Sequence, residues 1–552
     1  LDILTQTVLG SRTNPGVQED GMKHPTGPHL MVPGAGPDQF QSAQPVPSDQ
    51  GLQTIRLDLR NIGYGATVEK LPDKALLHVF SYLPHKEALK CARVCRKWRT
   101  IAYDSRLWQV VSLRPDYGGL HVNSVEALLA LISVRFGPQL RWMELPTDLI
   151  NYPVLHELAN KCPKLQYLTL DFSSAMQLHD FNDLQSFPAR LRGLTICLSE
   201  VIFLEGFVKK IYSFIGCVEI LHIIGTYEKV ESEEEVYEVI NVHKLISHTP
   251  NLRIMNLWGT AFVTDDHIES ISSNSVHLEC LMVNYCVKVK GACLKSLLAR
   301  CKKLKCLGME QCSLESRAVM AADWEKSQVQ ELNVTATELS TEAIISVLTR
   351  LPKLQILIAG YLEHFTDQAL EVWMESGACI ELRAVDLHFC DSLSEAVLTD
   401  FVTRFGEQLK GFIVGGHPKL LESFWLSHIP KMPNIRYLVF GVPETCCAKV
   451  QAKITIDQLM DCLSNNCPNL EALEIRWDPN TLRFSEKSSK FINVLRMRCL
   501  KLKCLVLTDG EYFEMVRSNF ERVGQTTVVR ATNYCRVTLV PLFQFYHDLI
   551  FN

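Results

Sequence analysis

A pattern of apolar residues, L-x-x-L-x-L with close substitutes, recurs along most of the chain and constrains its fold more than any other feature. Its fourteen occurrences begin at Leu140, Leu165, Leu191, Val218, Leu252, Leu278, Leu304, Val329, Leu354, Leu382, Leu409, Ile435, Leu470 and Leu502. Successive starts are 25 to 28 residues apart, except for three longer intervals of 34, 35 and 32 residues. A period of this length predicts stacked units that each contribute one short strand and one helix. Because a single unit cannot bury its apolar face alone, the core must be continuous through the array.

The segments between these patterns read as helices, and cysteine occurs at one fixed place in several units. One helical face of "LKSLLARCKKL" gathers Leu294, Leu297, Leu298 and Cys301. Eight residues after the first apolar position, three units carry Cys286, Cys312 or Cys390, and most others carry Thr, Ser, Asp or Gly. We expect these small side chains to satisfy backbone groups where the chain leaves the strand. From about residue 139 to residue 510, the array resembles the cysteine-containing class of leucine-rich repeats.

The composition favours a soluble protein with a large core and excludes several function classes. The chain has 552 residues, 47% hydrophobic and 21% charged, and a net charge of −5, which gives no basic stripe for nucleic acid. No apolar run of about 18 residues predicts a spanning helix, and neither a signal peptide nor a prenylation motif is recognisable at the ends. We expect the 20 cysteines to be reduced and mostly buried, the sequon at Asn333 to be unused, and the location to be cytoplasmic, nuclear or both.

A short helical segment precedes the array. In "LPDKALLHVFSYLP", residues 71–84, one helical stripe consists of Leu76, Val79, Phe80 and Leu83. A second apolar series, which predicts a second helix, consists of Leu89, Ala92, Cys95 and Trp98, and "DSRLW" with Trp108 predicts a short third one. Three helices in about 45 residues cannot enclose a sizeable core. The stripe therefore predicts a surface for a partner helix.

This segment resembles the F-box, through "LP" at 71–72, "VFSYLP" at 79–84, "ARVCRKW" at 92–98 and "DSRLW" at 104–108. An F-box before such repeats resembles the F-box and leucine-rich-repeat proteins. The resemblance implies a non-catalytic substrate receptor of an SCF-type ubiquitin ligase, with a Skp-type adaptor and, through it, cullin and RING subunits as partners. By position, it implies that the adaptor contacts are Leu71, Pro72, Phe80, Leu83, Leu89, Val94, Cys95 and Trp98. It implies no cofactor.

The expected fold is therefore an α/β solenoid, a curved array of about 14 repeats with parallel strands on the concave side and helices outside, preceded by a small three-helix F-box. We divide the chain into a disordered Pro/Gly/Gln-rich tail (1–66), the F-box (67–115), the solenoid (116–510) and a carboxy-terminal cap or tail (511–552). The last segment could cap the final repeat or reach into the concave side. The long intervals predict loops, among them an acidic run from Glu228 that is either a binding loop or a solvated one.

Strand residues alternate between two faces, so three positions of each unit are expected to point out from the concave side. They give a candidate substrate surface that consists of Asp171, Asn256, Trp258, Asn284, Glu310, Asn333, Asp386, His388, Glu474 and Arg476, with an apolar set of Ile358, Ile413 and Val439. An exposed Trp and an exposed Arg are typical of interaction hot spots. The target itself is a protein that the sequence does not identify.

We find no pattern for catalysis or metal binding. "CARVC" and "CKKLKC" have C-x3-C and C-x4-C spacing without a second pair or clustered His, so we interpret them as core cysteines. The adjacent Cys446 and Cys447 leave a reactive thiol open as an alternative. Two other functions also stay open: an F-box scaffold without a role in degradation, and an extracellular repeat receptor.

Overall fold

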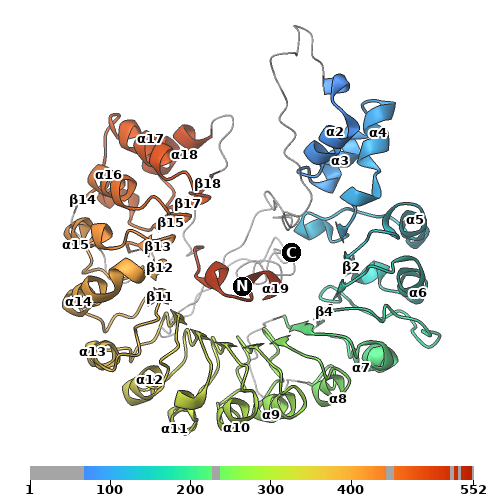
Figure 1. Ribbon diagram of the computed structural model, residues 1–552, viewed down its shortest axis with the longest axis horizontal. Coiled ribbons are helices and arrows are strands. Elements are labelled where there is room, and N and C mark those ends of the chain that lie inside the picture. Colours follow the sequence, from blue (N-terminus) through green and yellow to red (C-terminus); the bar gives the residue numbers. More distant parts are fainter. Residues whose placement is uncertain are drawn as a thin grey trace, which may run out of the picture. The chain divides into compact units, whose positions relative to one another are not determined.

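The computed structural model describes residues 68–199, 201–226, 237–442, 453–521, 527–531 and 536–549 (Figure 1). The chain divides into two compact units, and the boundary in the sequence falls between Val218 and Glu219. We call the described residues before this point the amino-terminal unit and those after it the carboxy-terminal unit.

The amino-terminal unit begins with three short helices, α2 (Asp73–Phe80), α3 (His85–Cys91) and α4 (Arg96–Ala102). They lie between the 3-10 turns η2 (Val68–Lys70) and η3 (Ser105–Leu107). Pro72 and Pro84 stand just before α2 and α3, with φ of −56° and −54°, and α4 begins after Cys95. The sequence prediction of one helix through the series from Leu89 to Trp98 is wrong, because the chain turns extended at Cys95, whose Sγ accepts a hydrogen bond from Trp98 N at 3.4 Å.

Four parallel strands follow in this unit, in chain order. They are β1 (Val110–Ser112), β2 (Trp142–Pro146), β3 (Tyr167–Asp171) and β4 (Gly193–Cys197). The helices between and after them are α5 (Val125–Leu131), α6 (Tyr152–Lys161) and α7 (Glu205–Ile211).

The carboxy-terminal unit continues the same alternation, and its strands also pair in parallel. Its first strands are β5 (Ile220–Ile224), β6 (Ile254–Asn256), β7 (Cys280–Met282), β8 (Cys306–Gly308), β9 (Glu331–Asn333), β10 (Ile356–Ile358) and β11 (Ala384–Asp386). The others are β12 (Gly411–Ile413), β13 (Tyr437–Phe440), β15 (Ala472–Ile475), β17 (Cys504–Leu507) and β18 (Val528–Ala531). A separate parallel pair joins β14 (Ile454–Thr455) and β16 (Leu482–Arg483).

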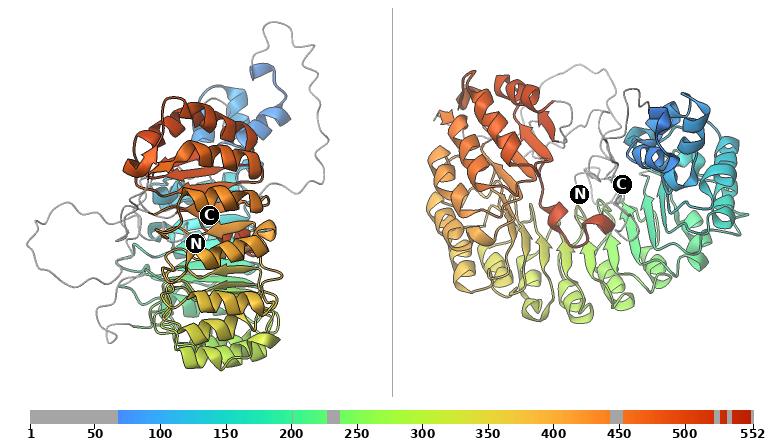
Figure 2. Two further views of the ribbon diagram at one scale, coloured as in Figure 1. Left: turned by 90° about the vertical axis from the view of Figure 1, so that its left-hand side faces the viewer. Right: turned by 45° about the horizontal axis from the view of Figure 1, so that its top comes forward.

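Helices cover one side of this sheet (Figure 1). They are α8 (Val242–Ser247), α9 (Asp265–Asn274), α10 (Leu294–Arg300), α11 (Ser316–Met320), α12 (Thr341–Leu348), α13 (Asp367–Glu375), α14 (Glu395–Phe405), α15 (Glu422–His428), α16 (Ile456–Asn466), α17 (Ser488–Arg498) and α18 (Glu511–Phe520). We call the opposite side of the sheet the strand face. A turn, η13 (Val540–Leu542), and a last short helix, α19 (Tyr546–Leu549), lie on that face (Figure 2).

The apolar pattern predicted the repeats correctly. Each of the fourteen pattern starts lies two residues before the first residue of a strand, from β2 to β17. In one unit Leu278, Leu281 and Val283 are at most 1% exposed, as the core positions of the pattern require. Since complete burial of such a side chain is worth roughly 1.5–3 kcal/mol, repetition over many units stabilises the whole array. The prediction of an α/β solenoid behind three small helices is confirmed.

The recurring cysteines bond the backbone where the chain leaves a strand, as expected. Cys286, Cys312 and Cys390 each place Sγ 3.1 Å from a carbonyl oxygen of the preceding unit. Burial raises the pKa of Cys286 and of Cys390 to about 12, which keeps both as neutral thiols. The seventeen cysteines of the described ranges are all free.

Candidate functional site

The three-helix module carries several large apolar side chains that remain exposed. Val68, Val79, Tyr82 and Val94 are 53%, 50%, 74% and 64% exposed. We call these four residues the exposed apolar set. Large apolar side chains are more often buried, and four exposed ones on one small module favour a surface for a partner.

The predicted adaptor residues divide into three groups in the structure. Pro72 and Val94 are exposed, while Leu71, Leu83, Leu89, Cys95 and Trp98 are partly buried. Phe80, by contrast, is only 3% exposed and packs edge-on against Trp98, with ring centroids 5.3 Å apart. Phe80 therefore lies inside the module and positions Trp98. Of the apolar stripe predicted as a partner surface, Val79 points to solvent as expected, whereas Leu76 is only 1% exposed and faces inward like Phe80. Sequence reasoning missed Val68 and Tyr82 because neither lies on that stripe.

Polar contacts hold the helices together and attach them to the first repeat. Lys97 Nζ donates to Leu71 O at 2.7 Å, which ties α4 to the start of α2. His85 bonds Leu107 O at 2.9 Å and stacks on Trp108 with ring centroids 4.6 Å apart, and burial lowers the pKa of His85. Trp108 in turn packs against Phe136, with centroids 5.4 Å apart. The module is thus mounted on folded repeats by one side and presents its exposed apolar set elsewhere.

On the strands of the amino-terminal unit, one predicted substrate residue is already engaged. Asp171 is 6% exposed and forms an ion pair of 2.6 Å with Arg114. Nearby, Ser112 Oγ donates to Glu144 at 2.6 Å, and burial raises the pKa of Glu144 to about 7. The expectation that Asp171 is exposed for a target is wrong, because it neutralises a buried arginine.

In the carboxy-terminal unit, most of the predicted substrate residues are buried as well. The exposed fraction is 0% for Trp258, Asn284 and Glu474, 1% for Asn256, 2% for Asn333, 4% for Asp386, and 6% for Arg476 and Ile358. Ile413 and Val439 are 0% exposed. The expectation that Trp258 and Arg476 stand exposed as hot spots is therefore wrong. Alternation along a strand predicted which side chains leave the repeat core, and other contacts then cover them.

These strand-face side chains form polar networks with each other. Glu310 accepts hydrogen bonds from Tyr285 Oη at 2.9 Å and from Asn333 Nδ2 at 3.1 Å. Asp386 bonds and ion-pairs with His388, which stays partly exposed, and this carboxylate raises the pKa of His388 against the opposing effect of burial. Glu310 and His388 are thus the members of the predicted substrate set that keep partial exposure.

The other contacts come from the carboxy-terminal segment Arg536–Leu549, which we call the tail. The two backbone N–H groups of Arg536 and Val537 donate to one carboxylate oxygen of Glu474, each at 2.8 Å. Farther along, Gln544 N donates to Glu331 Oε1 at 2.6 Å. His222 Nε2 lies 3.0 Å from Asp548 O, and Figure 2 shows the tail running over the strands. Both alternatives predicted for residues 511–552 therefore occur: α18 and β18 extend the array, with β18 paired to β17, and the tail lies on the strand face.

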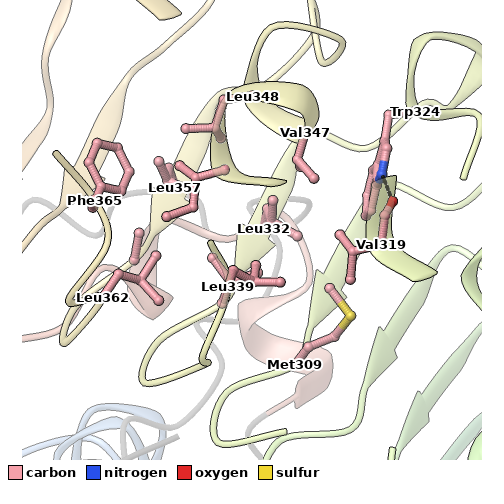
Figure 3. Close-up of a pocket in the computed structure, with 13 residues that line it drawn as sticks. Met309, Val319, Trp324, Leu332, Leu339, Val347, Leu348, Leu357, Leu362 and Phe365 are labelled. Atoms are coloured by element: carbon pink, nitrogen blue, oxygen red, sulfur yellow. Dashed lines mark hydrogen bonds between the residues drawn. The ribbon is translucent and has the colours of Figure 1, made fainter. Parts of the chain in front are cut away.

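The strand-side and helix-side layers also enclose a small gap near β9 (Figure 3). Its cavity volume is about 10 Å³, and its lining, which includes Met309, Leu332 and Phe365, is apolar. A volume of this size holds at most one water, and such a lining offers it no partner. We interpret the gap as a packing imperfection of the repeat core, filled on one side by Trp324, whose indole donates to Val319 O at 2.8 Å.

Other expectations concern metals, membranes and loops. Within the ranges described above, no three His, Cys, Asp or Glu side chains are grouped so that they could hold a metal ion. Over the same ranges, the helices are too short or too polar to span a bilayer. The acidic run from Glu228, and Cys446 with Cys447, lie outside the described residues.

Comparison with known proteins adds three findings. Residues 68–114 match the family model "F-box-like". The chain is similar to F-box/LRR-repeat protein 12 of Homo sapiens, 30% identical over 141 residues, and to that of Mus musculus, 30% identical over 147 residues. Each match covers 25% of this chain, and 41% and 43% of the relatives' length.

Among solved structures, the chain is similar to one described as "Crystal structure of Rad7 and Elc1 complex in yeast", with a TM-score of 0.39 and 15% identity. That similarity covers 75% of this chain and 90% of the other. The family match coincides with the three helices and the exposed apolar set. The chain thus carries an F-box-like domain at residues 68–114, followed by repeats of the leucine-rich type, and has distant relatives among F-box/LRR-repeat proteins.

Proposed function

We propose that this protein is a substrate receptor of an SCF-type ubiquitin ligase. The F-box-like domain binds a Skp-type adaptor, and the repeats hold a target protein. The observation that carries the proposal is the exposed apolar set on a module that matches the F-box-like family. In this role the chain performs no chemistry; it raises the local concentration of target lysines near the charged ubiquitin. Its place of action is the cytoplasm or the nucleus.

The adaptor surface consists of the exposed apolar set together with the partly buried residues around it. Trp98 is central, because Phe80 supports its ring and its side chain is only partly buried. Leu71, Leu83 and Leu89 add apolar area that is only partly covered in the chain alone.

The test is a quantitative binding assay with purified Skp-type adaptor. The double variant Val79→Asp/Val94→Asp places two charges on the proposed surface, and we expect it to bind the adaptor at least tenfold more weakly. Val134→Asp is the matched control, because Val134 is 71% exposed on the first repeat and lies outside the F-box-like match. Circular dichroism checks that both variants fold. Wild-type affinity in the double variant would refute the adaptor surface.

A second assay addresses the consequence for a target. Affinity purification under proteasome inhibition identifies proteins that bind the repeats, and depletion of the receptor should then lengthen their half-lives. Unchanged half-lives after depletion would favour the scaffold function instead.

A further inference from the structure

The tail crosses the strand face of the carboxy-terminal unit from the later strands back to the earlier ones. It meets Glu474 on β15 first, then β12, then Glu331 on β9, and ends at His222 on β5. Its apolar side chains are buried: Leu539 is 0%, Phe543 4% and Phe545 3% exposed. A single segment, which contains the turn η13 and the short helix α19, therefore covers a face that several repeats build.

The face is shaped for a close backbone approach at β12. A methyl group built on Gly411 would lie 2.4 Å from Leu539 Cδ2 and 3.2 Å from Leu542 Cδ1, so only a glycine leaves room for both leucines. The neighbouring strand contributes Ala384, another small residue, 3.0 Å from the same point. These small residues leave room for the branched side chains of Leu539 and Leu542 to pack against the strands.

The polar contacts between the face and the tail use backbone atoms of the tail. Two buried carboxylates receive N–H groups of Arg536, Val537 and Gln544, and an imidazole faces the carbonyl of Asp548. Every peptide has such N–H and carbonyl groups. The tail's own contribution to recognition is thus an apolar side-chain pattern on a backbone of short helical turns, and another segment of that kind can make the same contacts.

We propose that the strand face of the carboxy-terminal unit is a binding site for an apolar peptide segment that folds into short helical turns, as the tail does, and that the tail occupies this site in cis as a displaceable competitor. A target segment with similar chemistry gains access when the tail leaves. This inference rests on the proposed function in naming the incoming segment as part of a ubiquitination target; the binding site itself can be measured without the ligase.

The experiment uses the full chain and a fluorescent synthetic peptide of residues 536–549. The variant Val537→Pro/Gln544→Pro removes two N–H donors from the tail and leaves the face unchanged. Phe543 already has φ −63° and ψ 141°, the conformation that a following proline requires. Val537→Ala/Gln544→Ala keeps both N–H groups and is the matched control. We expect the proline variant to bind the peptide at least tenfold more tightly than either the wild type or the alanine variant does.

A second pair of variants tests whether the peptide binds at the proposed place. In the proline background, Glu331→Gln/Glu474→Gln should weaken peptide binding at least fivefold, because neutral amides replace charged acceptors. Glu338→Gln, at an exposed position of the same repeat, should change nothing. Equal peptide affinity in the wild-type, alanine and proline proteins would overturn the proposal.

Hydrogen exchange of the wild-type protein decides the matter if the proline variant does not fold. The amides of Arg536, Val537 and Gln544 should exchange faster than those of β9 and β15, because the tail opens without unfolding the strands. Exchange of the tail only together with the strands would make it a permanent part of the fold and would overturn the proposal. No adaptor is present in these assays, so a failure of adaptor binding would reject the proposed function and leave the peptide result standing.

Discussion

Ala336 occupies a backbone conformation that suits glycine better. Its φ is 52°, and the equivalent corner of other repeats is formed by Gly259, Tyr285 and Gly416, also at positive φ. The left-handed conformation costs a non-glycine residue roughly 1–2 kcal/mol, part of which the flexibility of glycine in the unfolded chain offsets. We therefore expect Ala336→Gly to raise the free energy of unfolding by about 0.5–1 kcal/mol, measured by urea denaturation.

The control for this substitution is Ala318→Gly, which should change stability in the opposite direction. Ala318 lies within α11, where glycine destabilises a helix by roughly 0.5–1 kcal/mol. A loss of stability from both substitutions would contradict the strain at Ala336. Tyr361 and Phe389 share the conformation but stack on each other with centroids 4.7 Å apart, so their strain is offset by a ring contact that glycine would remove.

His222 makes the contact between tail and strand face sensitive to acid. Burial lowers its pKa from 6.5 to about 3, and its second ring nitrogen lies 3.2 Å from Asn256 Nδ2. The folded protein therefore holds His222 neutral, while the unfolded chain takes up a proton below pH 6.5. Stability falls as the pH drops below 6.5, by up to about 2 kcal/mol at pH 5. Thermal melts at pH 7.5 and pH 5 should show that His222→Gln loses less stability between the two pH values than the wild type does. An equal loss of stability in both proteins would exclude this histidine as the cause.

Among the elements, α2 illustrates how one helix serves two purposes. Its inner side places Phe80 against Trp98, and its outer side presents Val79. We expect Phe80→Ala to destabilise the three-helix module by about 3–5 kcal/mol through the cavity it leaves. Tyr82→Ala, at a position that is 74% exposed, should leave its stability within about 0.5 kcal/mol of the wild type. The rate of limited proteolysis between α2 and α4 measures the stability of the module in both variants. Equal protection of the two variants would contradict the packing described.

Strands and repeat helices were predictable because their apolar spacing is a local property of the sequence. Each strand begins two residues after its pattern start, as at Leu278 and β7. The break between α3 and α4 at Cys95 could not be predicted from the sequence. A helical spacing of apolar residues continues across it, and only the thiol contact to Trp98 N marks the start of α4. The burial of Trp258 and Glu474 was not predictable either. For Glu474 the covering segment is the tail, more than sixty residues farther along the chain, and no pattern in the strand reports such a partner.

For the whole molecule, free thiols distinguish a reduced protein from a disulfide-stabilised one. Of the seventeen described cysteines, Cys217 is exposed and most others are buried. Brief treatment of the native protein with a maleimide should modify Cys217 first, and Cys286 or Cys312 only after unfolding, because burial raises the pKa of both thiols and hides them. Peptide mapping by mass spectrometry checks the order. Disulfide-linked peptides from the described cysteines would refute a reduced protein and support the extracellular alternative.

The contact between His222 and Asp548 joins residues 326 positions apart in the chain. Repeats otherwise contact their nearest neighbours, so the array can grow unit by unit with short loop closures. The tail is synthesised after every strand that it touches, and it can therefore dock only on repeats that have already assembled. Its docking adds a long-range closure to a protein of low contact order. A force applied at the tail should detach it in one early step, and the repeats should then unfold in later ones.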